Sequence, residues 1–293
     1  MAWAARLAIR KPLTSVRYLA SADHPAPDAA IVGIPYDRTQ SHRRGAAVGP
    51  QAIREASHSI ETYSPELDRD LQEVRLADLG DLPVSDLQPP AMLDAVQRAV
   101  ASLDPAVLTV LLGGDHTVTV GAVRALAARH PDLVVVQFDA HADFRDEYEG
   151  SRWSHACTMR RIWEVVGDGR IVQLGVRSGT RDELAFAQTH CRWSLSPLAA
   201  PETVLRELHD RPVYLSTDID VLDPAYAPGV GNPEPGGPSS AELMEALRLL
   251  GEVRVVAADV VETSPPHDPS STTAVAAAKI VRELVLAFAG RRR

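Results

Sequence analysis

Several features are missing from this sequence, and each absence narrows what the protein can be. No run of about 18 or more apolar residues occurs, so we expect no membrane span. The N-terminal segment lacks the long apolar core of a secretory signal, although it carries arginines and no acid before Asp23, which leaves a mitochondrial presequence open. Cys157 and Cys191 are the only cysteines, too few for a disulfide framework. Together these absences predict a cytoplasmic protein.

The chain is also short of basic residues. Its 30 lysines and arginines are outnumbered by 39 aspartates and glutamates, which gives a formal net charge of -9. Nucleic-acid binding needs a basic surface, so we expect no nucleic-acid partner; a small cationic substrate suits this charge better. Lys11 and Lys279 are the only lysines, and Asn232 is the only asparagine. Low asparagine is typical of heat-adapted proteins but low lysine is not, and a GC-rich genome accounts for both, so the growth temperature of the source stays open.

Short, continuous apolar runs alternate with helix-forming segments. Because the runs do not alternate apolar with polar residues, they predict strands that are buried on both faces. We expect strands at Ala30–Ile34, Leu108–Leu112, Leu133–Phe138, Ile171–Val176, Val213–Thr217 and Val253–Val261. We expect helices at Gly49–Ser59, Pro90–Ser102, Val118–Arg129, Thr158–Val166, Ser239–Leu250 and Thr272–Phe288. This order predicts an α/β fold of three layers, α/β/α, with a mostly parallel central sheet; without linkers or repeats, residues 1–293 are expected to form one domain.

Polar residues follow four of the predicted strands at the points where the strands end. In parallel sheets, ligands bind at the carboxyl ends of the strands. The polar positions are Asp115 and His116, the segment 139–143, the pair Asp218 and Asp220, and Glu262. We therefore expect four polar clusters to converge on one edge of one sheet.

Six residues in these clusters are of metal-ligating types: His116, Asp139, His141, Asp143, Asp218 and Asp220. The three between 139 and 143 are spaced two apart, as are the last two aspartates, so in an extended chain each set points the same way. Four carboxylates so close could not all ionise without cations. An acidic surface loop is the alternative, but these carboxylates directly follow strands too apolar to be exposed. The pattern predicts two divalent ions, favouring Mn²⁺ and leaving Zn²⁺, Co²⁺ and Fe²⁺ open.

At these residues the chain resembles the ureohydrolase family, the arginases and agmatinases, which release urea from guanidino groups. The resemblance covers nearly the whole chain, and its motifs are specific only in combination. They are GAAVGPQAIREAS (45–57), GGDHT (113–117), FDAHAD (138–143), STDIDVLDP (216–224), PGG (235–237) and VET (261–263). Two segments, YSPELDRDL (63–71) and DEYEGSRWSH (146–155), are most similar to bacterial agmatinases.

The resemblance implies an arginase-like fold and two Mn²⁺ ions per subunit that share a bridging hydroxide. The family pattern assigns His116 and Asp143 to one ion, His141 and Asp220 to the other, and Asp139 and Asp218 to both. Asp115, beside His116, would orient a ligand without binding metal. The family also implies a homo-oligomer, either a trimer or a hexamer.

The same resemblance implies roles in the reaction. Asp143 is expected to pass a proton to the departing amine after hydroxide attacks the guanidino carbon. His155 matches a mobile histidine that exchanges protons with solvent, and Glu262 matches the carboxylate that pairs with the guanidinium. The plainer alternatives are a loop histidine without a role and a structural salt bridge. Cys157 beside His155 invites a nucleophile hypothesis that we set aside, since the sequence shows no supporting base.

The segment that follows Asp143 resembles agmatinases rather than arginases, so the expected substrate is agmatine, hydrolysed to putrescine and urea. N1-aminopropylagmatine, giving spermidine and urea, is the main alternative. A guanidino acid would need a cationic pocket, for which Arg145 is the only support. Glu147 or Glu149 is a candidate partner for the ammonium of the substrate.

The loop 229–233 departs from a common family pattern. Val230 and Asn232 stand where many relatives carry threonines, beside the expected guanidino site. Asn232 is therefore a candidate substrate contact, and substrate preference is open there. An alternative of a different class is a catalytically silent metal-binding homologue; the intact ligand set with His155 and Glu262 argues against it.

Overall fold

The computed structural model describes residues 16–196, 198 and 202–290. Its centre is an eight-stranded sheet with the order β4-β1-β5-β10-β9-β6-β7-β8, in which all neighbours pair in parallel. The strands are β1 (Ala29–Gly33), β4 (Leu76–Asp81), β5 (Leu108–Leu112), β6 (Val134–Phe138), β7 (Ile171–Leu174), β8 (Trp193–Ser196), β9 (Val213–Asp218) and β10 (Val255–Val261). A small antiparallel sheet joins β2 (Tyr63–Ser64) and β3 (Arg69–Asp70).

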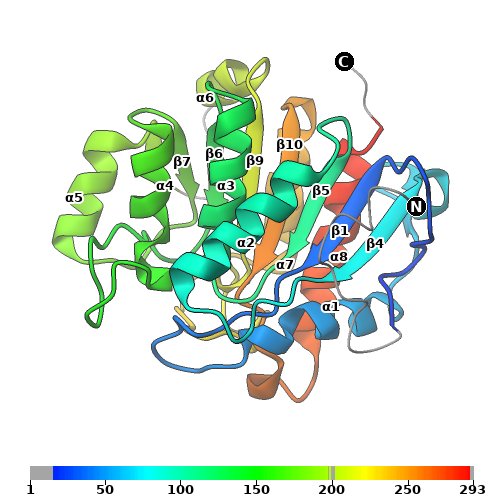
Figure 1. Ribbon diagram of the computed structural model, residues 1–293, viewed down its shortest axis with the longest axis horizontal. Coiled ribbons are helices and arrows are strands. Elements are labelled where there is room, and N and C mark those ends of the chain that lie inside the picture. Colours follow the sequence, from blue (N-terminus) through cyan, green and yellow to red (C-terminus); the bar gives the residue numbers. More distant parts are fainter. Residues whose placement is uncertain (1–15, 197, 199–201, 291–293) are drawn as a thin grey trace.

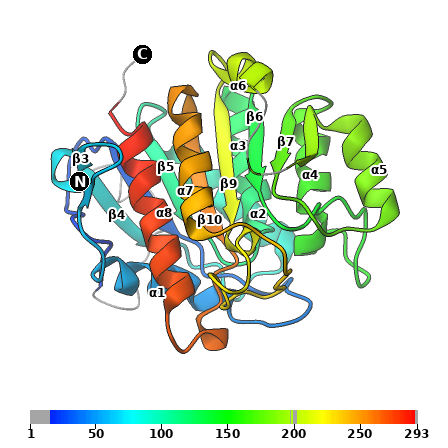
Figure 2. The same cartoon turned by 180° about the vertical axis from the view of Figure 1, so that it is seen from behind.

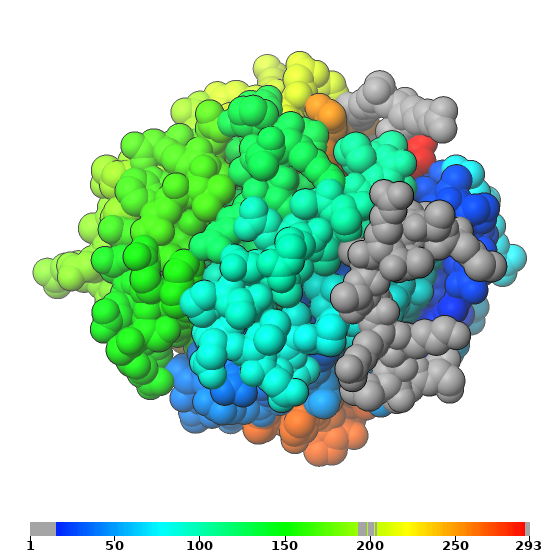
Figure 3. Space-filling model, viewed as in Figure 1, coloured from blue at the N-terminus to red at the C-terminus, as the bar shows by residue number. Residues whose placement is uncertain are grey.

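Helices cover both faces of the central sheet. Figure 1 shows α2, α3 and α4 in front of the strands, and Figure 2 shows α7 and α8 on the opposite face. On the first face, the side chains of these helices close over the strands (Figure 3). The helices are α1 (Gly49–Ser57), α2 (Pro89–Ser102), α3 (Val118–Arg129), α4 (Thr158–Val166), α5 (Arg181–His190), α6 (Glu202–Leu208), α7 (Ser240–Leu249) and α8 (Thr272–Phe288). The predicted three-layer architecture is confirmed, and the central sheet is wholly parallel.

The apolar residues of the strands divide between two cores, one on each face. Val134, Val136 and Phe138 of β6 pack in the core beneath α7 and α8. Val135, between them, packs in the core beneath α2, α3 and α4. Every residue of β6 is buried, because both of its faces are covered. This is why the strand reads as a continuous apolar run.

Most predicted elements are confirmed with small shifts at their ends. The strand predicted to start at Val253 starts at Val255, because residues 250–252 form a 3-10 helix. The sequence reasoning missed β4, β8, α5, α6 and the small sheet. Strand β4 was not predicted because it contains Asp78, whose carboxylate is buried against the Arg54 guanidinium at 2.8 Å. Within the described residues, no helix has the length and apolar character needed to cross a bilayer.

The strand order decides where the polar residues meet. Strands β5, β10, β9 and β6 are consecutive neighbours in the sheet, although their sequence positions are far apart. All four run in the same direction, so their carboxyl ends lie at one edge. The loops that follow β1, β9 and β10 gather at that edge, at the lower end of the molecule in Figure 2. The predicted convergence of four polar clusters is thereby confirmed.

Candidate metal centre and substrate pocket

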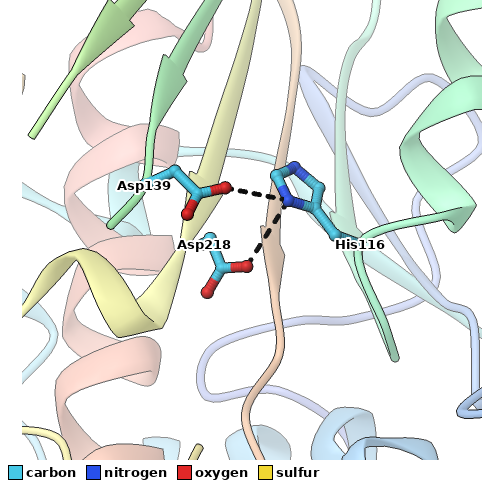
Figure 4. Close-up of side chains that lie close together, drawn as sticks. All are labelled: His116, Asp139 and Asp218. Atoms are coloured by element: carbon cyan, nitrogen blue, oxygen red, sulfur yellow. Dashed lines mark ion pairs between the residues drawn. The ribbon is translucent and has the colours of Figure 1, made fainter. Parts of the chain in front are cut away.

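A buried histidine lies at the centre of the first cluster of carboxylates. His116 Nδ1 is 3.1 Å from Asp139 Oδ2, 3.1 Å from Asp143 Oδ2 and 3.4 Å from Asp218 Oδ2. Figure 4 shows Asp139 and Asp218 directed at the imidazole from neighbouring elements. All four side chains are buried. His116, Asp139 and Asp218 form one group with atoms close enough to hold a metal ion.

A second group lies beside the first and shares a residue with it. His141 Nδ1 is 2.9 Å from Asp220 Oδ2 and 3.6 Å from Asp139 Oδ1. Asp139, His141 and Asp220 also place ligand atoms close enough for one ion. Asp139 thus offers one oxygen to each group. The two groups, each of which could hold a metal ion, therefore share Asp139.

The electrostatics of the cluster fit divalent cations. His116 Nδ1 is buried and makes no hydrogen bond within the described part of the chain, although three carboxylate oxygens lie close to it. Burial, then the neighbouring Asp220 and Asp139, raise the pKa of Asp218 well above its usual range. Burial and the Asp139 charge raise the pKa of Asp143 to about 6. Buried carboxylates with raised pKa values, gathered around an imidazole nitrogen, have the donor chemistry of a hard or borderline metal site.

The extended conformation predicted for these segments is wrong in two places. Strand β6 ends at Phe138, and Asp143 has a positive φ of 54°, so the chain turns before this residue. Asp220 lies in a 3-10 helix, Ile219–Val221, which Asp218 caps by accepting a hydrogen bond from the Asp220 amide at 2.9 Å. The side chains converge through turns. Simple alternation along a strand does not produce the cluster.

His116 is held from behind by residues that the sequence reasoning missed. Its Nε2 lies 3.0 Å from Ser216 Oγ, and that hydroxyl donates to Asp259 Oδ1 at 2.7 Å. Asp259 Oδ2 accepts from Tyr214 and Thr119. The chain Asp259–Ser216–His116 fixes the ring with Nδ1 directed at the carboxylates. The available signal was an aspartate inside the apolar run 253–261.

Asp115 lies away from the ligand atoms. Its Oδ2 accepts hydrogen bonds from the amide and the hydroxyl of Thr39, at 2.9 and 2.8 Å. Burial, together with the Glu262 charge, raises the pKa of Asp115 to about 7. Its observed contacts hold the loop after β1, and the role of orienting a metal ligand stays a prediction.

Glu262 and His155 face each other next to the metal-ligand cluster. Glu262 Oε1 is 3.5 Å from His155 Nδ1 and accepts from the His116 amide at 2.9 Å, while Oε2 accepts from Gln40 at 2.6 Å. His155 Nε2 lies 3.0 Å from Ser41 Oγ. Burial alone would lower the pKa of His155, but Glu262 and nearby aspartates raise it to about 9. Burial opposes ionisation of Glu262, yet His155 and the hydrogen bonds keep the pKa of this carboxyl below its usual value.

A cavity of about 250 Å³ opens over these groups. Its lining includes His141, Asp143, His155, Asp218, Asp220, Asn232 and Glu262, together with Arg145, Tyr148, Ser178, Thr180 and Glu183. The side-chain oxygen of Asn232 is buried and has no hydrogen-bond partner among the residues that the structure describes. Glu147 and Glu149 are exposed and do not line the cavity, so this candidate assignment for the ammonium is wrong. The sequence reasoning missed Glu183.

The fold is a parallel α/β sheet, and the cluster of buried carboxylates and histidines lies at its carboxyl edge. These two features are typical of one class of α/β proteins with metal sites, and comparison with known proteins assigns the chain to a family. The model of the arginase family matches residues 27–287. The chain is 40% identical to the agmatinase of Bacillus subtilis over 89% of its own length and 92% of that protein. It is 38% identical to the N(1)-aminopropylagmatine ureohydrolase of Thermococcus kodakarensis, over 83% of this chain and 86% of the relative.

Solved structures agree. The agmatine ureohydrolase of Thermoplasma volcanium superposes with a TM-score of 0.84 at 32% identity, covering 94% of each chain. The chain therefore belongs to the arginase family. The predicted resemblance, the predicted arginase-like fold and the prediction of a ureohydrolase-type enzyme are confirmed.

Proposed function

We propose that the protein hydrolyses agmatine to putrescine and urea with two Mn²⁺ ions bound. Water supplies the oxygen of urea, the bond between the guanidino carbon and the chain-bearing nitrogen breaks, and that nitrogen leaves with a proton as an amine. Agmatinase-named relatives support the guanidino substrate. The observation that carries the proposal is the Glu262 carboxylate, which lines the cavity and is fixed by hydrogen bonds from the His116 amide and Gln40.

The metal part of the proposal uses the two groups that share Asp139. We assign His116 and Asp143 to one ion, His141 and Asp220 to the other, and Asp139 and Asp218 to both. Mixed carboxylate and imidazole ligands suit Mn²⁺. When bound, two such ions lower the pKa of water so that a nucleophile is present at neutral pH.

Glu262 is proposed to bind the guanidinium. Hydrogen bonds from His116 N and Gln40 Nε2 fix both of its oxygens, so its plane is set before the substrate arrives. A planar guanidinium pairs well with a carboxylate held in this way. Asn232, with its unpartnered oxygen in the same cavity, is proposed as a second contact to guanidino N–H groups.

Asp143 and His155 are proposed to handle protons. Both line the cavity on the side of the cluster, and the Asp143 carboxylate contacts His116. Asp143 holds the proton that the departing amine requires. The His155 side chain lines the cavity, contacts Ser41 and keeps 12% of its surface exposed. It can therefore pass protons between the site and solvent.

Two other substrates remain candidates, and a specific observation favours each. The relative from Thermococcus kodakarensis makes N1-aminopropylagmatine the main alternative. Arg145 in the cavity lining keeps a guanidino acid open as a substrate.

We also propose that the active protein is a homo-oligomer, a trimer or a hexamer, located in the cytoplasm. Residues 1–293 are proposed to form one domain, whose segments 1–15 and 291–293 lie outside the described residues.

The test is a comparison of urea release at equal concentrations of agmatine, N1-aminopropylagmatine, 4-guanidinobutanoate and arginine, using protein loaded with Mn²⁺. We expect agmatine to be hydrolysed fastest. Urea release from none of the four by fully metallated protein would support a silent metal-binding homologue instead. Faster release from another guanidine would keep the reaction class and replace the substrate.

A further inference from the structure

Two glutamines interrupt the apolar strands β6 and β7 and face each other across this strand pair. Gln137 of β6 and Gln173 of β7 are register partners, and both side chains are fully buried. The residues on either side of each glutamine pack in the core beneath α7 and α8, so the glutamine side chains lie on the other face of the sheet. A buried amide costs free energy unless hydrogen bonds satisfy it, and an apolar pair would carry no such cost. The two glutamines therefore call for a reason beyond packing.

The glutamines extend a row of buried polar side chains that crosses the sheet. Gln137 also pairs in register with Ser216 of β9, and Ser216 pairs with Asp259 of β10. The row therefore runs through four neighbouring strands, β7, β6, β9 and β10, just before their carboxyl ends. Its half on β9 and β10 fixes the ring of His116. Its half on β6 and β7 lies next to Asp139, which follows β6 directly.

The hydrogen bonds of the glutamine pair run in one direction and end on Asp139. Gln173 Nε2 donates to the Ala142 carbonyl at 2.9 Å and to Gln137 Oε1 at 2.6 Å. Gln137 Nε2 in turn donates to Asp139 Oδ2 at 2.6 Å. Because a carbonyl oxygen can only accept, Gln173 must present its NH₂ group to Ala142. Its second N–H then meets the oxygen of Gln137, which leaves the NH₂ group of Gln137 facing the carboxylate.

Asp139 is the residue that the two candidate metal groups share. Its Oδ1 accepts from the His141 amide at 2.6 Å, while Oδ2 accepts from Gln137 and lies 3.1 Å from His116 Nδ1. With a donor on each oxygen, the plane of the carboxylate is set. With the donor on Oδ1 alone, the carboxylate could rotate about the Cβ–Cγ bond. Such a rotation would displace oxygens that belong to both groups.

We propose that Gln137 is a positioning residue for the metal pair, because it fixes the plane of the Asp139 carboxylate, and that Gln173 fixes the direction of the Gln137 amide. The proposal rests on the proposed function, in which Asp139 binds both ions. Partners that hold a metal ligand in this way raise the affinity of the site for its metal. The two buried amides are thus retained for metal binding, at the expense of a simpler apolar core.

The test measures Mn²⁺ affinity of the metal-free protein by competition with a fluorescent chelator. Gln137→Met keeps an unbranched side chain of similar size but removes the donor. It is expected to weaken binding of both ions by about tenfold to a hundredfold, because Asp139 belongs to both groups. Gln137→Asn, whose amide is one methylene shorter, is a second variant with the same expected loss. Gln173→Met keeps the Gln137 donor but releases its direction, so it should weaken binding less than Gln137→Met.

The matched control is Val135→Ala, two residues before Gln137 on the same buried face of β6. It leaves a small cavity and should lower the unfolding free energy of the metal-free protein, but it removes no hydrogen bond and should leave Mn²⁺ affinity unchanged. Unchanged affinity in both Gln137 variants would overturn the proposal. A loss of affinity in Val135→Ala equal to theirs would also overturn it, by showing that Gln137 only supports the fold. Wild-type protein that binds fewer than two Mn²⁺ ions would instead refute the metal part of the proposed function.

Discussion

His155 Nδ1 lies 3.5 Å from Glu262 Oε1, so the histidine proposed to carry protons is in contact with the carboxylate proposed to bind the substrate. His155 lies in the segment after β6 and Glu262 directly after β10, and β9 separates these two strands in the sheet, so only the fold brings the residues together. A guanidinium that binds Glu262 competes with His155 for the same oxygen. When the guanidinium cation binds Glu262, it is therefore expected to displace His155 from this oxygen and leave the imidazole free for proton transfer.

Glu262→Gln is expected to retain metal and lose activity. The amide keeps most of the shape but cannot form a charged pair with a guanidinium. Losing one partner of a buried charge pair costs about 2–5 kcal/mol, so kcat/KM for agmatine should fall by about thirtyfold or more. Metal analysis and urea release measured on the same preparation separate the two effects. Loss of both metal ions in this variant would contradict the assigned role.

Asp220→Ala is expected to lower the metal content. Asp220 belongs to the group with Asp139 and His141, so its removal should empty mainly that position, leaving about one ion per subunit where we propose two. The measurement is elemental analysis after dialysis against a metal buffer. Asp210→Ala, which removes an exposed aspartate, provides the control. Equal metal content in the two variants would count against a ligand role for Asp220.

Ser216→Ala and Asp259→Asn are expected to weaken metal binding without touching a proposed ligand. Both changes break the chain that directs His116 Nδ1 at the carboxylates. Changes in such supporting residues typically cost about tenfold to a hundredfold in metal affinity. Competition with a fluorescent chelator measures that affinity directly. Unchanged affinity in both variants would mean that the packing around His116 fixes the ring by itself.

The stability of the metal-free protein is expected to depend on pH through His155. The pKa of His155 is raised from 6.5 to about 9 in the folded protein. The protonated ring therefore stabilises the fold fully below pH 6.5, and this contribution is lost as the pH rises through about 9. The difference in unfolding free energy between wild type and His155→Asn should therefore be largest near pH 6 and shrink above pH 9. Urea titrations at several pH values measure it. His209→Asn, at an exposed histidine, should show no such trend.

Neither thiol is expected to react in the native protein. Burial raises the pKa of Cys157 to about 12, and that of Cys191 likewise to about 12, so almost no thiolate is present at pH 8. A thiol reagent should label both only after denaturation, and Cys157→Ala should keep urea release. Rapid labelling of Cys157 with loss of activity would revive the cysteine nucleophile hypothesis.

The central strands and the polar residues at their ends were predictable because each signal is local. An apolar run such as 108–112 indicates a buried strand whatever surrounds it, and the next residues fall at the sheet edge. The edge strand β4 was not predictable in this way, since the buried Asp78 carboxylate is satisfied by groups far away in the sequence, the Arg54 guanidinium and the Tyr18 amide. Helix α5 did carry a readable signal, the pair Thr180 and Glu183 of its capping box.

For the candidate site, too, local signals could be read from the sequence and long-range contacts could not. The candidate metal ligands could be named from the sequence because their types and spacings are distinctive. The supporting contacts could not be read from the sequence, since Asp259 acts on His116 only through Ser216 on the neighbouring strand. Glu183 was missed because nothing in its local sequence shows that α5 lines the cavity. Asp143 was placed correctly in the cluster but with the wrong backbone conformation, because a turn cannot be inferred from alternation.

Two of the proposed functional carboxylates, Asp143 and Glu262, have left-handed backbone conformations, with φ of 54° and 64°. Aspartate tolerates this region fairly well, whereas a glutamate there is strained, and glycine would adopt it freely. The neighbouring structure must therefore hold these positions against their own preference. A search for sequences that merely fold better would replace Glu262 early and lose the substrate contact. A substitution at Glu262 that stabilises the fold would remove the proposed substrate contact. Substitutions meant to raise heat resistance should therefore be made elsewhere in the molecule.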